Sequence, residues 1–298
     1  SFVSVENAKL NLKAETDGLT FDDVRDNAVR DWEERLSSIR MNSSDDEIMT
    51  VFYTALYHSM IMPTDFTDVN GEYLGFDKQV HVADGYTYRT DMSLWDTCRD
   101  AHSLYTLIAH DVQNDCLESL VEMTKTGGVI PRWPMGAGYA SSMHGDPANI
   151  VITESYLKGF RDFDVETLYS YMKNSSENAV QRSGRNFIEL YNEYGYIPDD
   201  LANGEESVSF TLEYAWEDNA IAVLADALGH KEETIPAVDA TCSAEGHTEG
   251  VICDRCGIWI TEPQTIAKLP HTDEDEDGVC DVCGESDIYG GCVCLCHN

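Results

Sequence analysis

Positive charge is scarce in this sequence. Its 298 residues include 19 Lys and Arg against 55 Asp and Glu, which gives a formal net charge of -36. A chain this acidic repels nucleic acid and anionic membrane surfaces, so both are excluded as partners. We expect it instead to bind hard cations such as calcium, which prefer oxygen ligands.

Long apolar runs are absent as well. No stretch is long enough to span a bilayer, so we expect no membrane insertion by this segment. The first residues lack an initiator Met and the charged and apolar regions of a signal peptide, and they lead directly into a helical pattern. We therefore expect an internal piece of a longer protein.

Cysteine is rare over most of the chain and then abundant. Only Cys98 and Cys116 fall in the first 240 residues, whereas eight of the ten cysteines lie between Cys242 and Cys296. Residues 1–232 therefore predict a reduced globular domain, for which a hydrophobic content of 42% is ample. Residues 233–298 predict a small Cys-rich module held by metal or disulfides.

Apolar residues recur at helical spacing through most of the first 230 residues. The irregular stretch 64–92, with Asn70-Gly71 and Asp84-Gly85, predicts a hairpin or a long excursion over one rim. About eight helices without convincing buried strands predict an all-α domain, best matched by a ring of helical hairpins with its function on the loops. The predicted helices are residues 22–41, 45–62, 95–109, 111–126, 148–160, 165–175, 181–194 and 207–229.

The run 88–99 places a tryptophan beside several charged groups. If Asp96 lies in the first turn of a helix, Arg99 follows one turn later, so a carboxylate and a guanidinium can converge on one polar ligand beside Trp95. Sugars are commonly bound in this way. The same residues fit equally well a core tryptophan next to a helix-capping Asp–Arg pair.

Two further segments carry polar groups in unusual places. The loop 131–147 joins Trp133, His144 and Asp146 to glycines that let backbone approach a ligand. In the last predicted helix, Glu213 and Glu217 are one turn apart, where they can share a calcium ion; the alternative is a solvated acidic face.

Six short motifs together resemble the helical catalytic domain of family 92 glycoside hydrolases, in the same order and at similar spacing over residues 1–232. They are Phe52-Tyr53-Thr54-Ala55-Leu56-Tyr57-His58, Ser93-Leu94-Trp95-Asp96-Thr97 with Arg99, Arg132-Trp133-Pro134, Met143 with Gly145-Asp146-Pro147, Tyr156-Leu157-Lys158-Gly159, and Thr211-Leu212-Glu213-Tyr214-Ala215. The resemblance implies a calcium-dependent, exo-acting, inverting α-mannosidase, built from a β-sandwich followed by an (α/α) toroid. This chain would supply the first part of the toroid.

The resemblance also implies roles for individual residues. Trp95, Asp96 and Arg99 would line the subsite for a terminal mannose, together with Trp133. Glu213 would lie near the calcium, and His144 and Asp146 would flank the leaving group.

The catalytic carboxylates depart from the family pattern. An inverting hydrolase needs a carboxylic acid and a carboxylate on opposite faces of the sugar. The expected acid position holds Tyr139, so the acid would be Asp146 or Glu154 from a shifted position, or a mannosyl phosphodiester substrate would need none. The family's Gly-Asn-Asp-Asp base motif is absent, so we expect little hydrolysis from this chain alone. The alternative is a non-catalytic glycan-binding or surface-interaction protein.

The Cys-rich tail contains two Cys-x-x-Cys-Gly knuckles, a geometry that presents two thiolates to zinc. The candidate zinc ligands are Cys253, Cys256, Cys280, Cys283, His247 and His271. Either one ion uses both knuckles, or each repeat uses its own His and two Cys, with Cys242 completing the first site; disulfides are the alternative. The tail resembles repeats on Gram-positive surface proteins, which implies a bacterial, extracellular or cell-surface location and association through the tail.

Overall fold

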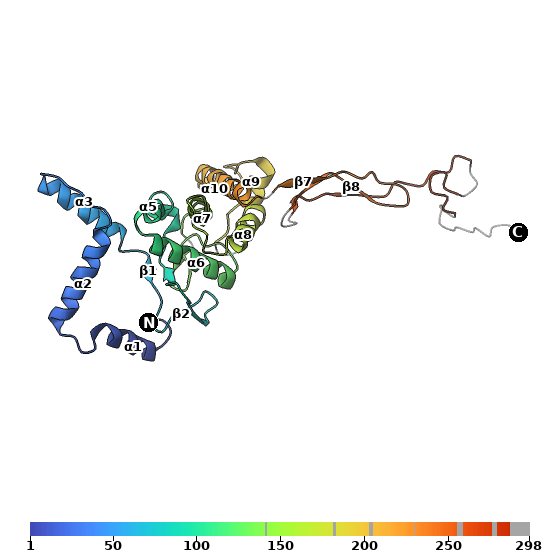
Figure 1. Ribbon diagram of the computed structural model, residues 1–298. Coiled ribbons are helices and arrows are strands. Elements are labelled where there is room, and N and C mark those ends of the chain that lie inside the picture. The colour runs from blue at the N-terminus through green and yellow to red at the C-terminus, as the bar shows by residue number, and fades with distance from the viewer. Residues whose placement is uncertain are drawn as a thin grey trace. The chain divides into compact units, whose positions relative to one another are not determined.

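A computed structural model describes residues 1–140, 142–180, 183–202, 205–229, 231–254, 259–275 and 279–286. The chain divides into two compact units, Ser1–Leu224 and Ala225–Asn298 (Figure 1). The first unit is mainly helical and the second is built from short strands, so the prediction of a mainly helical domain is confirmed. Of the helices in the described part of the chain, none is both long and apolar enough to cross a membrane.

The first three helices begin at well-formed caps. They are α1 (Val5–Thr16), α2 (Phe21–Leu36) and α3 (Asp46–Ser59). Ser4 and Asp45 accept backbone N–H bonds at the starts of α1 and α3, and Thr20 forms a capping box with Asp23 at the start of α2. Buried residues are few: α2 has none, and α1 and α3 have one each.

A rim of short strands follows α3. Strand β1 (Thr64–Asp65) pairs with β4 (Arg89–Thr90), and β2 (Glu72–Leu74) forms an antiparallel hairpin with β3 (Val80–Val82). The buried rings of Tyr73 and Tyr88 stack beneath this rim with centroids 3.8 Å apart. The β2–β3 pair is the hairpin that the turn signals in 64–92 predicted.

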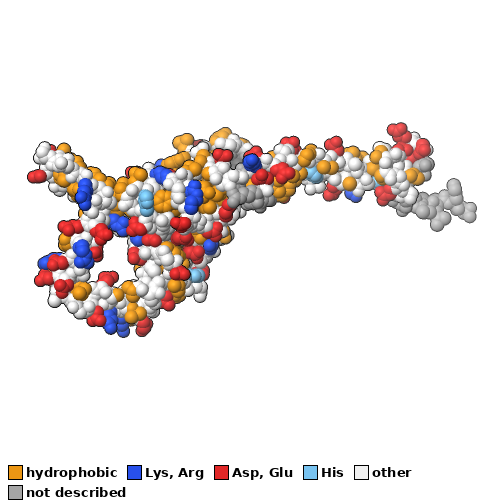
Figure 2. All heavy atoms as spheres, in the orientation of Figure 1, with side chains coloured by type: hydrophobic (Ala, Val, Ile, Leu, Met, Phe, Trp, Pro, Cys, Tyr) orange, Lys and Arg blue, Asp and Glu red, His pale blue; other side chains and the backbone are white. Residues whose placement is uncertain are grey.

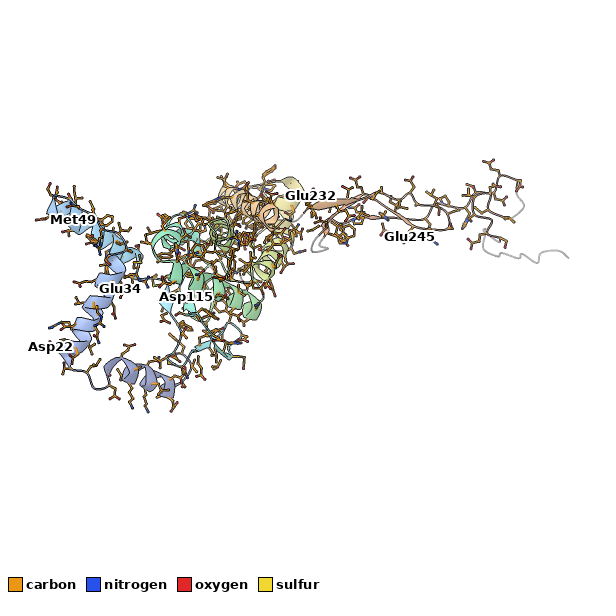
Figure 3. All side chains as sticks on the ribbon, in the orientation of Figure 1. Asp22, Glu34, Met49, Asp115, Glu232 and Glu245 are labelled. Atoms are coloured by element: carbon orange, nitrogen blue, oxygen red, sulfur yellow. The ribbon has the colours of Figure 1, made fainter. Side chains whose placement is uncertain are left out.

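The core of the first unit lies among α4 (Leu94–Thr97), α5 (Ala101–Ile108), α6 (His110–Gly127), α7 (Ala148–Leu157) and α8 (Val165–Glu177). Helix α6 contacts both α5 and α8, and Leu117, Leu120 and Met123 on it are completely buried. Burial of each such side chain contributes roughly 1.5–3 kcal/mol. Side chains crowd together around these helices, whereas those of α2 and α3, including Glu34 and Met49, stand apart (Figure 3).

Two further helices complete the unit. They are α9 (Ile188–Tyr194) and α10 (Ser207–Leu228), which share a small apolar cluster made by Ile197, Ala202, Phe210 and Tyr214 with Phe187 and Tyr191. Between α6 and α7, β5 (Pro134–Met135) pairs with β6 (Gly138–Tyr139) in the long loop.

Two predicted helices are shorter or broken. The described residues form ten helices rather than about eight, partly because the helix predicted at 95–109 is divided at Asp100, whose backbone leaves the helical region. The helix predicted at 181–194 begins only at Ile188, because Phe187 adopts a left-handed conformation with φ +57°. The boundary predicted at 232/233 stays a prediction.

The second unit contains two small antiparallel sheets. Strands β10 (Trp259–Thr261), β9 (Gly250–Cys253) and β7 (Glu232–Ile235) form one, in that order, and β11 (Thr265–Ile266) pairs with β8 (Gly246–His247) in the other. The buried apolar side chains described in this unit beyond α10 are Ala240, Cys242, Cys253 and Cys280. Cysteines thus take the place of an ordinary apolar core.

Candidate functional site

Helix α4 and the first half of α10 meet around the side chain of Arg99. Its guanidinium lies 4.6 Å from the Trp95 ring centroid and 5.3 Å from that of Trp216, and Nη2 donates to Glu213 Oε1 at 2.9 Å. An arginine held between two aromatic faces and paired with a carboxylate is fixed in orientation. We call Trp95, Arg99, Glu213 and Trp216 the Arg99 site.

Two polar atoms of the Arg99 site are buried without a protein partner. They are Trp95 Nε1 and Glu213 Oε2. Buried polar atoms normally have a hydrogen-bond partner, so an unpaired donor beside an unpaired acceptor indicates a place for a polar ligand. Asp96 is exposed; its carboxylate accepts a short hydrogen bond from Ser93 Oγ, and its backbone carbonyl accepts from the Arg99 N–H at 3.3 Å.

A second group of charges lies next to α10, where Arg185, Asp146 and Glu217 are completely buried and Asp218 is partly exposed. Arg185 donates from Nε to Asp146 Oδ1 at 2.7 Å and from Nη1 to Asp218 Oδ1 at 2.5 Å, and its Nε lies 3.5 Å from Glu217 Oε2. The backbone N–H of Asp146 donates to Glu217 Oε1 at 2.8 Å. We call these four residues the Arg185 cluster.

The two buried carboxyl groups of the Arg185 cluster, those of Asp146 and Glu217, have pKa values shifted in opposite directions. Burial raises the pKa of Asp146, but the charge of Arg185 and hydrogen bonds from Glu217, Ser175 and Arg185 together outweigh it, so the pKa lies below its usual range. Burial, and then the Asp146 charge, raise the pKa of Glu217 well above its usual range. The Glu217 carboxyl therefore binds its proton more tightly than an ordinary glutamate, and the Asp146 carboxyl binds its proton more weakly than an ordinary aspartate.

Arg132 joins two loops beneath this cluster. Its Nε donates to Gly145 O at 2.6 Å and its Nη1 to Met143 O at 2.7 Å, while Nη2 reaches Gly184 O at 2.6 Å and Ser183 O at 3.3 Å. The planar guanidinium suits several carbonyls at once, as a lysine ammonium would not. Arg132 thus fixes the loop that carries Asp146 against the loop that carries Arg185.

The sequence profile of the glycosyl hydrolase family 92 catalytic domain matches residues 7–236, and the motifs that build the Arg99 site lie inside that range. The chain belongs to glycoside hydrolase family 92. The resemblance inferred from the six motifs is thus confirmed.

Solved family 92 structures are similar in fold and sequence. A family 92 α-mannosidase from Bacteroides thetaiotaomicron, solved with mannoimidazole, is 34% identical with a TM-score of 0.71, over 77% of this chain and 29% of that one. A family 92 inverting mannosidase from the same bacterium is 27% identical with a TM-score of 0.72, over 77% of this chain and 31% of that one.

A fungal protein is also similar in sequence. An uncharacterized secreted glycosidase of Arthroderma benhamiae is 26% identical over 78% of this chain and 28% of its own length. The chain therefore spans less than a third of the length of the relatives that it matches.

Family 92 implies calcium, and the two predicted carboxylate ligands have different neighbours. Glu213 is paired with Arg99, and Glu217 lies against Arg185. Glu213 Oε2 and Glu217 Oε2 are both buried without a hydrogen-bond partner, and a free carboxylate oxygen suits a calcium ion. The assignment of these two residues to calcium stays a prediction.

The loop residues predicted to touch substrate have separate surroundings. Trp133 is half-buried, and the His144 ring packs edge-on against Phe210 at 4.2 Å, with Nε2 3.7 Å from Glu206 Oε2. His144 Nδ1 is buried without a partner, so this ring retains one polar atom for a ligand. Asp146 lies inside the Arg185 cluster instead.

The three candidates for the general acid each form hydrogen bonds with other groups of the protein. Tyr139 donates to the Val129 carbonyl at 3.1 Å. Glu154 accepts from Ser103 Oγ and Lys158 Nζ, each at 2.5 Å; burial raises the pKa of Glu154, but these hydrogen bonds lower it below the usual range. Asp146 is likewise held by Arg185, so each of the three residues is engaged in a contact within the protein.

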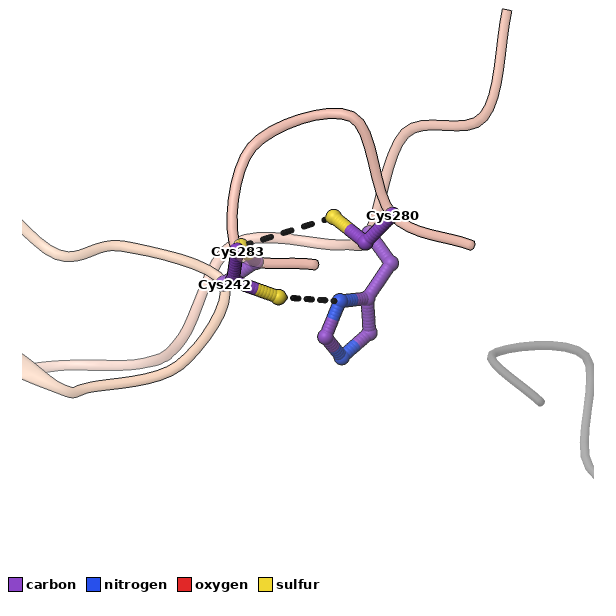
Figure 4. A group of neighbouring side chains, drawn as sticks. Cys242, Cys280 and Cys283 are labelled. Atoms are coloured by element: carbon purple, nitrogen blue, oxygen red, sulfur yellow. Dashed lines mark hydrogen bonds between the residues drawn. The ribbon is translucent and has the colours of Figure 1, made fainter. Parts of the chain in front are cut away.

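The second unit brings together four side chains that could bind a metal ion (Figure 4). They are Cys242, His271, Cys280 and Cys283, whose ligand atoms all lie within 4.8 Å of one another. The other predicted ligands described, His247 and Cys253, are not in this group, and Cys256 lies outside the described residues. Backbone N–H groups, first that of Cys283, lower the pKa of the Cys280 thiol to about 6.

Sequence reasoning missed two residues of these sites. Trp216 follows Glu213 by three positions on α10, a spacing that places both on one side of a helix and was available in the sequence. Arg185 gave no such signal, because its partners lie 33 and 39 residues away along the chain.

Proposed function

We propose that this chain forms the mannose-binding portion of a family 92 α-mannosidase catalytic domain. Residues 1–232 would be part of an (α/α) toroid, and residues 233–298 a separate Cys-rich tail. The α-mannosidases among the solved relatives support this proposal. The single observation that carries it is the Arg99 site, in which a fixed guanidinium adjoins a buried, unpaired donor and acceptor.

The residues of the Arg99 site suit the chemistry of a pyranose. The Trp95 ring can stack against the apolar face of the sugar while its Nε1–H donates to a hydroxyl. Arg99, turned by its pair with Glu213, donates charge-assisted hydrogen bonds from its remaining N–H groups. The exposed carboxylate of Asp96 accepts from hydroxyls at the rim.

Glu213 is the residue that we assign to calcium. Its Oε1 is held by Arg99, which leaves Oε2 directed elsewhere. The ion, when bound, supplies a Lewis acid that binds sugar hydroxyls and favours ring distortion. Calcium requires six to eight oxygens, so the remaining ligands would come from other groups.

Hydrolysis by this chain alone is not expected. Inversion requires an acid and a base on opposite sides of the sugar, and Tyr139, Asp146 and Glu154 are each tied into other contacts. The sequence also has no Gly-Asn-Asp-Asp motif. Because the acid and base are not available in this chain, a second candidate function is glycan binding without catalysis.

Calorimetric titration of mannose tests the proposal. We expect binding in the presence of calcium, and its loss with excess chelator. Arg99→Ala should weaken binding at least tenfold, whereas Arg161→Ala, which removes an exposed arginine stacked on the Tyr156 ring, should leave it unchanged. Binding that is insensitive to both chelator and Arg99→Ala would disprove the assigned site.

An assay with an aryl α-mannoside separates the two candidate functions. Turnover at the background level, with mannose binding retained, would favour glycan binding by this chain. Turnover above background would contradict the expected incompleteness. We further propose an extracellular or bacterial cell-surface location with attachment through the tail, which fits the secreted fungal relative; labelling of intact cells with an impermeant antibody would test it.

A further inference from the structure

The second unit has too little apolar burial to hold its fold by itself. Its described core beyond α10 consists of one alanine and three cysteines: Ala240, Cys242, Cys253 and Cys280. Small modules of this kind are usually stabilised by a metal ion or by disulfides. Cys242, Cys280 and Cys283 are free thiols, and together with His271 they form one group of potential metal ligands.

We propose that Cys242, His271, Cys280 and Cys283 bind one zinc ion in a closed, tetrahedral, structural site. Cys242 Sγ lies 3.7 Å from Cys280 Sγ. Zinc–sulfur bonds of about 2.3 Å at the tetrahedral angle separate two sulfurs by roughly 3.8 Å, whereas a disulfide brings them to about 2.05 Å. The observed spacing therefore matches two ligands of one ion.

The histidine is placed to supply the nitrogen ligand. His271 Nδ1 lies 3.4 Å from Cys283 Sγ, close to the roughly 3.6 Å expected between a sulfur and a nitrogen on one zinc ion. The other ring nitrogen, Nε2, lies 3.6 Å from Glu285 Oε2. A carboxylate at that nitrogen fixes the tautomer and orientation of a metal-binding imidazole.

The backbone holds these ligands in place. Gly284 follows the second knuckle with φ +75° and donates to Cys280 O at 2.8 Å, which closes the turn that presents Cys280 and Cys283 together. The Asp281 N–H donates to Thr272 O at 2.9 Å, next to His271. Leu269 N donates to Thr241 O at 3.0 Å and brings the Cys242 segment alongside.

This ligand set differs from one in which both Cys-x-x-Cys knuckles bind the same zinc ion. Cys242 precedes the first repeat in the chain, yet it completes the site of the second repeat. Cys253, from the first knuckle, is buried but is not a member of the group. The proposed site thus combines three thiolates with one imidazole, rather than the four thiolates of two paired knuckles, which gives it a distinct spectroscopic signature.

X-ray absorption at the zinc edge tests the ligand set on the full 298-residue chain, purified in reductant, stripped of metal and reloaded with zinc. Three sulfurs at about 2.3 Å and one nitrogen at about 2.0 Å are expected. Four sulfurs without nitrogen would overturn the proposal, as would the absence of bound zinc.

Zinc content of variants identifies the ligands. Cys242→Ser and His271→Ala should each lose one equivalent of zinc and leave the tail more sensitive to protease, with the helical unit unchanged. Cys98→Ser, a buried thiol of the first unit, is the control and should keep the full zinc content. If Cys253→Ser loses the same equivalent, and the double variant Cys242→Ser/Cys253→Ser loses no more, the two knuckles share one ion and the proposed set is wrong.

Discussion

Burial, and then the charge of Asp146 beside it, raise the pKa of Glu217 well above its usual range. A group whose folded pKa lies above its unfolded value of about 4.3 contributes stability that is fully present below that value and lost as the pH rises. We therefore expect the free energy of unfolding to fall between pH 5 and pH 7.5, less steeply in Glu217→Gln. Urea unfolding at several pH values measures this.

The control for this experiment is Glu189→Gln, which removes an exposed carboxyl. It should keep the wild-type pH dependence. Equal slopes in Glu217→Gln and the wild type would show that Glu217 is ionised in the folded chain.

Position 145 requires glycine both because its backbone is left-handed and because a buried carboxyl group lies against it. Its φ is +70°, and a Cβ atom there would lie 1.9 Å from the buried Glu217 Oε1. We expect Gly145→Ala to lower the free energy of unfolding by about 3 kcal/mol or more, because left-handed strain and a clash with a buried group add. Gly128→Ala, with φ +83° but open space, should cost only about 1 kcal/mol. Equal losses in chemical denaturation would contradict the role given to the contact.

At the scale of elements, Arg132 acts on two loops that flank α7 and α8. Arg132→Lys keeps the charge but cannot reach the carbonyls of Met143, Gly145 and Gly184 together. We expect a loss of at least about 2 kcal/mol in unfolding free energy, since buried carbonyls are left without donors. Arg161→Lys, at an exposed position, should change stability little. A similar small change for Arg132→Lys would show that water replaces the guanidinium.

The elements themselves were largely predictable, and their contacts were not. Helices α3, α6 and α10 lie where the sequence predicts them, because apolar residues at helical spacing depend only on near neighbours. The segment before α9 is not helical, since Phe187 is left-handed and Ser183, Gly184 and Arg185 are held by distant groups. Periodicity carries no information about partners more than thirty residues away.

For the same reason, only the local part of each functional site could be predicted from the sequence. The short run around Trp95 and Arg99 was evident from its residue types, but its pairing with α10 was not. In the tail, the knuckles predicted thiolate sites from local spacing, whereas the place of Cys242 in the second repeat depends on a long-range fold of the backbone.

At the scale of the whole molecule, α1 to α3 expose many apolar side chains among charges (Figure 2). The largest exposed fractions include Phe2 69%, Val5 66%, Leu12 64%, Phe21 83% and Val51 64%. We expect the isolated chain to bind a hydrophobic dye and to self-associate, more so at high salt, which screens its net charge of -36. Light scattering coupled to size-exclusion chromatography measures this.

Matched variants locate the surface responsible. The pair Phe21→Ser with Val51→Ser should reduce association several-fold, whereas Val208→Ser, an exposed apolar residue of α10, should not. A monomer at all salt concentrations without dye binding would contradict the expectation.

The position of Arg132 also has a consequence for the order of folding. Its carbonyl partners Ser183 and Gly184 are 51 and 52 residues away, with α7 and α8 between. Such contacts require closure of a long loop, so they form late, after both helices have docked. Loss of Arg132 should then act mainly on the rate of unfolding and hardly on the rate of folding, which makes this one side chain a determinant of how long the folded state lasts.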